Sequence, residues 1–200
     1  MQTMSGRARY KAEVQAEILR AAREIVVREG YENFSMRALA KQIGYSTAAT
    51  YKHFKSKGEI FEHLAIESFA ALMAVSEGVK SVPGEDAVDR LKRGMLAYVH
   101  FGLQNPDHYR IAFLLHAPGT ARPAEPRAAY AGLKSRVQRC IDTGTFRSGD
   151  VELMAQSLWA AAHGVTSLLI QKPAFPWVAR RKLIARVIDS AVGGLLAPCK

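Results

Sequence analysis

Apolar residues recur at helical spacing along most of the chain, and no run alternates apolar and polar residues long enough to indicate a strand. Val14, Ile18 and Ile25 form one stripe of a helix predicted over 10–29, and Gly30 follows as its stop signal. Further helices are predicted at about 36–44, 46–54, 56–79, 150–171 and 177–196, with the remainder between 85 and 142. We therefore predict an all-α fold of about nine helices.

Turn signals divide these helices into two groups. Three short to medium helices come first, and six more form a larger helical bundle. Proline-containing breaks at 81–86, 105–107 and 117–126 separate helices of the second group. The expected domains are residues 1–57, a helix-turn-helix domain, and residues 58–200, a ligand-binding and dimerisation domain.

The stretch GYSTAATYKHF (44–54) has the spacing of a helix-turn-helix. Gly44 suits the left-handed conformation of a sharp turn, and Ser46 is a helix-capping residue. The small side chains of Thr47, Ala48 and Ala49 would let the second helix approach base edges in the DNA major groove. Tight packing of this helix against a neighbouring helix would also explain them.

Positive charge surrounds this stretch. The formal net charge is +10, and residues 35–57 hold five Lys or Arg and no Asp or Glu. A basic, acid-free segment is suited to phosphate contacts. Two alternatives remain open at this point: charge that only serves solubility, and a basic protein that binds acidic membranes or polyanions without sequence specificity.

Other function classes find little support in the sequence. Cys140 and Cys199 belong to no metal-binding spacing, and we find no nucleophile elbow, HExxH motif or phosphate-binding glycine loop. The longest apolar stretch, 158–170, is too short to span a bilayer. We expect a cytoplasmic protein that is not an enzyme, has no metal or cofactor and does not bind membranes.

The segment FSMRALAKQIGYSTAATYKHFKSKGEIF resembles the N-terminal domain of TetR-family transcriptional repressors. Tyr45 and Thr50 depart from the residues usual at their positions. The resemblance implies a double-stranded DNA operator as partner. Carried over by position, it places these residues at the DNA: Ser35, Arg37, Ser46, Thr47, Ala48, Ala49, Tyr51, Lys52, His53 and Lys57. Lys52 can face phosphates or bases, and His53 can instead pack locally.

The second part of the chain resembles one TetR subclass through SLWAAAHGVTSLLI, with its Trp-x-x-x-His-Gly pattern, and NPDHYRIAF. The resemblance implies a homodimer and an unidentified small-molecule effector. The helix over 150–171 is apolar nearly all round, so we expect it to bury a second face. The residues expected at the dimer interface are Leu158, Ala162, Val165, Leu169, Ile184, Val187, Ile188 and Ala191.

Aromatic residues, methionines and histidines of the middle helices are candidates to line an effector pocket, although such stripes also form cores. The candidates are Phe69, Met73, Met95, Tyr98, Phe101, Tyr109, Phe113, His116, Trp159 and His163.

Overall fold

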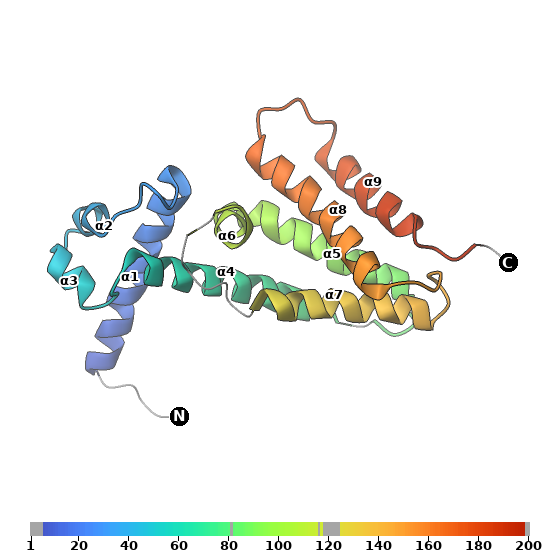
Figure 1. The fold of residues 1–200 in the computed structure, drawn as a ribbon, viewed down its shortest axis with the longest axis horizontal. Coiled ribbons are helices and arrows are strands. Elements are labelled where there is room, and N and C mark those ends of the chain that lie inside the picture. Colours follow the sequence, from blue (N-terminus) through green and yellow to red (C-terminus); the bar gives the residue numbers. More distant parts are fainter. Residues whose placement is uncertain (1–5, 81, 116, 118–124, 199–200) are drawn as a thin grey trace. The chain divides into compact units, whose positions relative to one another are not determined.

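The computed structural model describes residues 6–80, 82–115, 117 and 125–198 and is helical throughout (Figure 1). Within these residues no strand is formed beyond one isolated bridge between Phe146 and Leu196. The helices are α1 (Gly6–Glu29), α2 (Met36–Gln42), α3 (Thr47–Tyr51), α4 (Lys57–Gly78), α5 (Ala87–Gln104), α6 (Pro106–Tyr109), α7 (Glu125–Asp142), α8 (Val151–Gln171) and α9 (Arg180–Gly193), with a π turn, η1 (Arg110–Leu114), after α6. The all-α prediction is confirmed.

The chain forms two compact units. Unit 1 comprises residues 1–68 and 107–123, and unit 2 comprises residues 69–106 and 124–200. Helix α4 is continuous from Lys57 to Gly78, so its residues are divided between the two units. The division falls after Ser68, eleven residues beyond the end of the expected first domain. The π turn η1 also belongs to unit 1, although it lies far along the chain.

Unit 1 has its own hydrophobic core. The α1 stripe that the sequence predicts is buried, with Ile18 and Ile25 at 0% and 1% exposure. It packs with Leu39 of α2, Phe54 and Ile60, and Ile111 of η1 belongs to the same cluster. A cluster of this size holds the short helices α2 and α3 in place, which their own length could not do.

Unit 2 is a bundle in which α5 packs against α7, α8 and α9, and α8 also packs against α7 and α9 (Figure 1). The helix α8 buries most of its apolar residues here, including Met154, Leu158 and Val165. Three other apolar side chains of α8 remain exposed: Leu153 at 68%, Trp159 at 41% and Leu168 at 48%. Apolar side chains of α8 therefore lie outside its covered face as well, and the expected burial of a second face stays a prediction.

This burial corrects the expected dimer interface. Leu158, Ala162, Val165, Leu169, Ile184 and Ile188 are each at most 6% exposed, and Val187 and Ala191 pack partly buried against the same core. The six buried side chains are not available to a partner, whereas Val187 and Ala191 keep part of their surface and stay predicted interface residues. The apolar stripe predicted for the interface is the one that faces the bundle. The prediction failed there because periodicity alone does not tell which apolar face the chain itself covers.

The length argument against a membrane span also needs correction. The apolar stretch 158–170 lies within the 21-residue helix α8, which by length and composition alone could cross a bilayer. The core helix of a soluble protein passes the same test. The buried residues of α8 and its packing on α5, α7 and α9 identify it as such a core helix.

A polar network joins α7 to α8 at Glu152. Its carboxylate lies 2.6 Å from Lys134 Nζ, and it accepts hydrogen bonds from Tyr130 Oη at 2.7 Å and Gln156 Nε2 at 3.0 Å. The hydrogen bonds from Lys134, Tyr130 and Gln156 lower the pKa of Glu152 to about 2. Burial, and then the bond to Glu152, raise the pKa of Tyr130 to about 12.

This network predicts a loss of stability in acid. Because the pKa of Glu152 lies below its unfolded value of 4.5, the stabilisation is complete above that pH and disappears as the pH falls toward about 2. We expect Glu152→Gln to lower the melting temperature at neutral pH and to reduce its fall between about pH 5 and about pH 3. Thermal unfolding at several pH values measures this. An unchanged acid profile in the variant would exclude the network as a source of the acid sensitivity.

Candidate nucleic-acid interface

The turn between α2 and α3 is built on Gly44. Its φ is +71°, the left-handed region. The Gly44 amide donates to the Lys41 carbonyl at 3.4 Å and the Tyr45 amide donates to the Ala40 carbonyl at 3.0 Å. These two bonds satisfy carbonyls at the end of α2 in the pattern of a Schellman motif. The expected helix-turn-helix geometry is present, with α2 in contact with α3.

Replacing Gly44 by alanine tests the turn. No atom lies within 4 Å of an added Cβ, so the cost comes from the left-handed backbone alone. We expect Gly44→Ala to lower the free energy of unfolding by about 1 kcal/mol. Gly78→Ala is the matched control, since Gly78 also has open space but no positive φ. Chemical denaturation measures both variants, and equal stabilities would contradict the role assigned to the turn.

Three serines begin the helices of this region. Ser35, Ser46 and Ser56 each accept a hydrogen bond through Oγ from the amide three residues ahead, at 3.2, 3.1 and 3.1 Å. Each bond satisfies an otherwise unpaired amide of a first helical turn. The hydroxyl hydrogens of the exposed Ser35 and Ser46 are still able to donate to a phosphate oxygen.

The two unusual residues of the motif fit the structure. Tyr45 packs partly buried against the unit 1 core, and its hydroxyl donates to Glu17 of α1 at 3.0 Å, which raises the pKa of the tyrosine. Thr50 is fully buried, and its hydroxyl donates to the Ser46 carbonyl at 3.3 Å. Neither leaves a buried polar group unpaired. The sequence does not single out Glu17 as the partner of Tyr45, because Glu17 is one of many acidic residues on the predicted helices.

The α3 segment presents its small residues outward. Ala48 is exposed, Thr47 and Ala49 are partly exposed, and Tyr51 is 49% exposed. Phe54 faces the other way, is 2% exposed and makes an edge-to-face contact with His63 of α4. The core residue anchors the segment, and its outer face carries no large side chain before Tyr51.

Exposed cations flank this face. Arg37, Lys41, Lys52 and Lys55 are all exposed, and within the described part of the chain their side chains form no ion pair. Their charge is therefore not neutralised internally. Exposed cations of this kind can contact DNA phosphates, while the adjacent face of small side chains can approach the bases.

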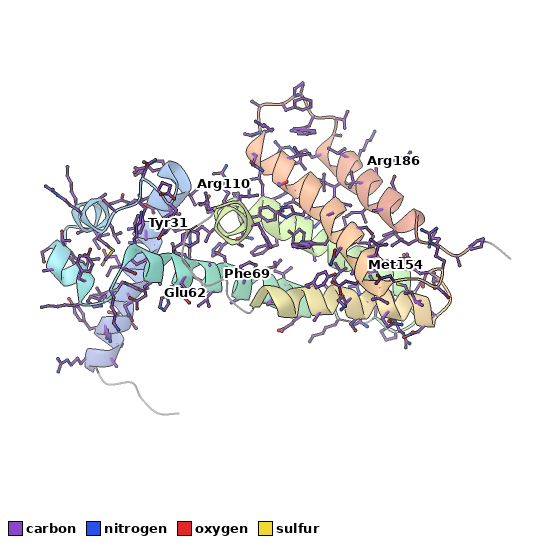
Figure 2. All side chains as sticks on the ribbon, viewed as in Figure 1. Tyr31, Glu62, Phe69, Arg110, Met154 and Arg186 are labelled. Atoms are coloured by element: carbon purple, nitrogen blue, oxygen red, sulfur yellow. The ribbon has the colours of Figure 1, made fainter. Side chains whose placement is uncertain are left out.

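Two of the expected DNA-contacting residues, Lys57 and His53, are partly buried by other residues of unit 1. Lys57 Nζ lies 4.5 Å from the ring centroid of Tyr31 and donates to the Tyr31 carbonyl at 3.4 Å, and Figure 2 labels this tyrosine. His53 is half-buried, and its Nδ1 has no hydrogen-bond partner among the described residues. Lys57 therefore has a structural contact that the sequence did not indicate, because Tyr31 lies 26 residues earlier.

Comparison with known proteins agrees with this geometry. Residues 18–64 match the family described as bacterial regulatory proteins, tetR family, and residues 91–191 match the tetracyclin repressor-like C-terminal domain. The second match alone covers half of the chain. The chain belongs to the TetR family. As a TetR-family member it is a DNA-binding transcriptional regulator, and the first match covers α2, α3 and the start of α4.

Individual TetR relatives align over part of their length. The chain is 35% identical over 96 residues to the nucleoid occlusion factor SlmA of Vibrio campbellii, covering 48% of each protein. It is 37% identical over 82 residues to the HTH-type transcriptional repressor AcnR of Corynebacterium diphtheriae, covering 41% of this chain and 40% of AcnR. The chain thus spans about half the length, or less, of these curated relatives.

A solved structure aligns over almost the whole chain. The TetR-family regulator PfmR of Thermus thermophilus superposes with a TM-score of 0.72 at 26% identity, over 90% of this chain and 99% of PfmR. The helix order of this chain is therefore that of a TetR-type fold.

The expected effector-pocket residues are distributed over both units. Tyr109 and Phe113 belong to unit 1, whereas seven of the others belong to unit 2: Phe69, Met73, Met95, Tyr98, Phe101, Trp159 and His163. His116 lies outside the described residues. Met95 is part of the unit 2 core. Within unit 2, Tyr98 Oη lies 3.0 Å from His163 Nδ1, and the centroids of the Trp159 and His163 rings are 6.0 Å apart.

Proposed function

We propose that this TetR-family chain is a ligand-responsive repressor that binds a palindromic operator as a homodimer and leaves it when a small molecule binds unit 2. The observation that carries the proposal is the outward, small-residue face of α3 beside unpaired cations. In this arrangement Thr47, Ala48 and Ala49 contact base edges in the major groove. The phosphate contacts come from Ser35, Arg37, Ser46, Tyr51 and Lys52, and His53 and Lys57 are placed beside them.

A homodimer gives the short α3 segment enough affinity and a two-fold target. The proposed interface uses the exposed residues Leu153 and Leu168 of α8 together with outward positions of α9. A single chain leaves these apolar side chains in water, and a second copy would cover them. Two α3 segments would then read half-sites about one helical turn apart or further.

The effector is proposed to bind within unit 2 near Tyr98 and His163. Tyr98 Oη and His163 Nδ1 hydrogen-bond to each other, which leaves His163 Nε2 as the ring nitrogen for a ligand. Burial lowers the pKa of His163 and so favours its neutral form. Trp159 supplies an adjoining aromatic surface. The narrower assignment to the Trp-His-Gly subclass rests on this segment of α8.

Release of DNA is proposed to act through α4, the helix whose residues belong to both units. A ligand that changes the orientation of α4 changes the separation of the two α3 segments. Fixed half-site spacing then disfavours the liganded dimer. Repression is supported by the name of the relative AcnR, a transcriptional repressor. A location in the cytoplasm follows from an operator on the chromosome.

Fluorescence anisotropy with a selected operator tests ligand release. A compound library is screened for members that raise the dissociation constant, and active compounds are repeated with Tyr98→Phe and His163→Asn. We expect an effector to weaken operator binding by about 10- to 100-fold and both variants to weaken the response. Equal operator affinity in every ligand-saturated state would remove the switching part of the proposal and leave the DNA-binding part intact.

A further inference from the structure

Unit 2 contains a cavity of about 490 Å³ that lies apart from the proposed effector residues. It is lined by the loop before α5, the first turn of α5 and the second half of α7, and Glu85, Asp86, Arg90, Ser135, Arg136 and Arg139 are among its lining residues. None of the ten residues expected at an effector pocket lines it. A space of this size accommodates a small metabolite.

The two acidic residues of the cavity have partners of their own. Glu85 forms a two-pronged pair with Arg93, with Nη2 2.7 Å from Oε2, and this pairing lowers the pKa of the carboxyl. Asp86 caps α5 by accepting from the Val88 amide at 3.3 Å. Each of these carboxylates thus has a partner, and within the described residues no ion pair involves Arg90, Arg136 or Arg139.

Arg90 has a buried donor without an acceptor. Its Nε is inaccessible to solvent and has no hydrogen-bond partner among the residues that the structure describes. An unpaired buried donor of a charged group is costly. Arg90 also lines the cavity, so the outer nitrogens of its guanidinium group are the ones available to an anion bound there.

Arg136 is fixed in place on the opposite helix. Its Nη2 donates to the Ser76 carbonyl near the end of α4 at 2.9 Å, and its Cζ lies 3.3 Å from the position a Cβ on Gly94 would occupy. The guanidinium therefore lies close against the α5 backbone, where only glycine leaves full room. Burial, and then the charges of Arg90 and Arg93, lower the pKa of Arg136.

From these contacts we propose that the cavity binds the phosphate group of a small molecule, held by Arg90, Arg136 and Arg139. Three guanidinium groups around one space suit an anion with several peripheral oxygens, because each planar fork can donate paired N–H bonds. Arg136 is oriented beforehand by its contacts with Ser76 and Gly94. Nothing in the DNA-binding function requires this site.

Isothermal titration with inorganic phosphate and with phenyl phosphate, at constant ionic strength, tests the proposal. We expect saturable binding of one phosphate group per chain for at least one of the two probes. If only one probe binds, its identity shows whether the site takes free phosphate or an organic phosphate. Arg90→Gln should weaken this binding by about tenfold or more. Malonate should bind more weakly than phosphate.

A variant with the same loss of charge serves as the control. Arg186→Gln removes a cation from α9, where Figure 2 labels it, away from the cavity lining. It should bind phosphate like the original protein. The proposal is overturned if neither probe saturates, if malonate binds as well as phosphate, or if Arg90→Gln binds like Arg186→Gln.

Discussion

Ala48→Glu abolishes sequence-specific DNA binding in this account while the fold stays intact. Ala48 is exposed in the first turn of α3, so a longer side chain is accommodated in the free protein. Against DNA the same side chain would hold α3 away from the base edges and would place a negative charge between phosphates. We expect the dissociation constant for the operator to rise by about 100-fold or more, with an unchanged melting temperature.

Ala70→Glu is the matched control for this variant. Ala70 is an exposed alanine of α4 in unit 2, and the same change there should leave operator binding unaltered apart from a small charge effect. Anisotropy with the operator and with a random duplex separates specific from general binding. If Ala48→Glu and Ala70→Glu bound the operator equally, α3 would not be the base-reading segment.

Leu168→Glu is expected to convert the dimer into monomers. Leu168 is 48% exposed on α8, so a single chain tolerates a charge there, whereas two glutamates would be buried at a two-fold interface. Loss of the second α3 segment should then weaken operator binding by about 100-fold or more. Sedimentation velocity and operator titration measure the two effects on the same sample.

The control for Leu168→Glu is Val75→Glu, at an apolar position of α4 that is 37% exposed. It should leave both mass and DNA affinity unchanged. A dimer that survives Leu168→Glu would show that the α8 face is not the interface, and would leave the reading of DNA by α3 unaffected.

Local signals made the DNA-binding part of the fold predictable. The α2–α3 turn needs a glycine at one position and a capping serine two residues later, and both requirements are visible within three residues of sequence. Contacts over long sequence separation were not predictable in the same way. The pairing of Tyr45 with Glu17 and of Lys57 with Tyr31 depends on how α1 packs, which residue spacing does not reveal.

The second half of the chain shows the limit of periodicity more clearly. The α8 pattern is apolar nearly all round and does not tell which residues face α5 and α9, and six of the eight expected interface residues are buried. The arginine cavity was also missed. Arg90 and Arg136 lie on different helices far apart in the sequence, and each alone is indistinguishable from a solvent-exposed helical arginine.

Selection from a random duplex library at about 150 mM salt separates base reading from nonspecific phosphate binding, because the latter weakens at that concentration. Retained duplexes are sequenced after several rounds with the full chain. We expect an enriched inverted repeat, with half-sites about one helical turn apart or further. If retention instead falls steeply with salt and no consensus is enriched, Thr47, Ala48 and Ala49 do not read bases and the protein is not a sequence-specific regulator.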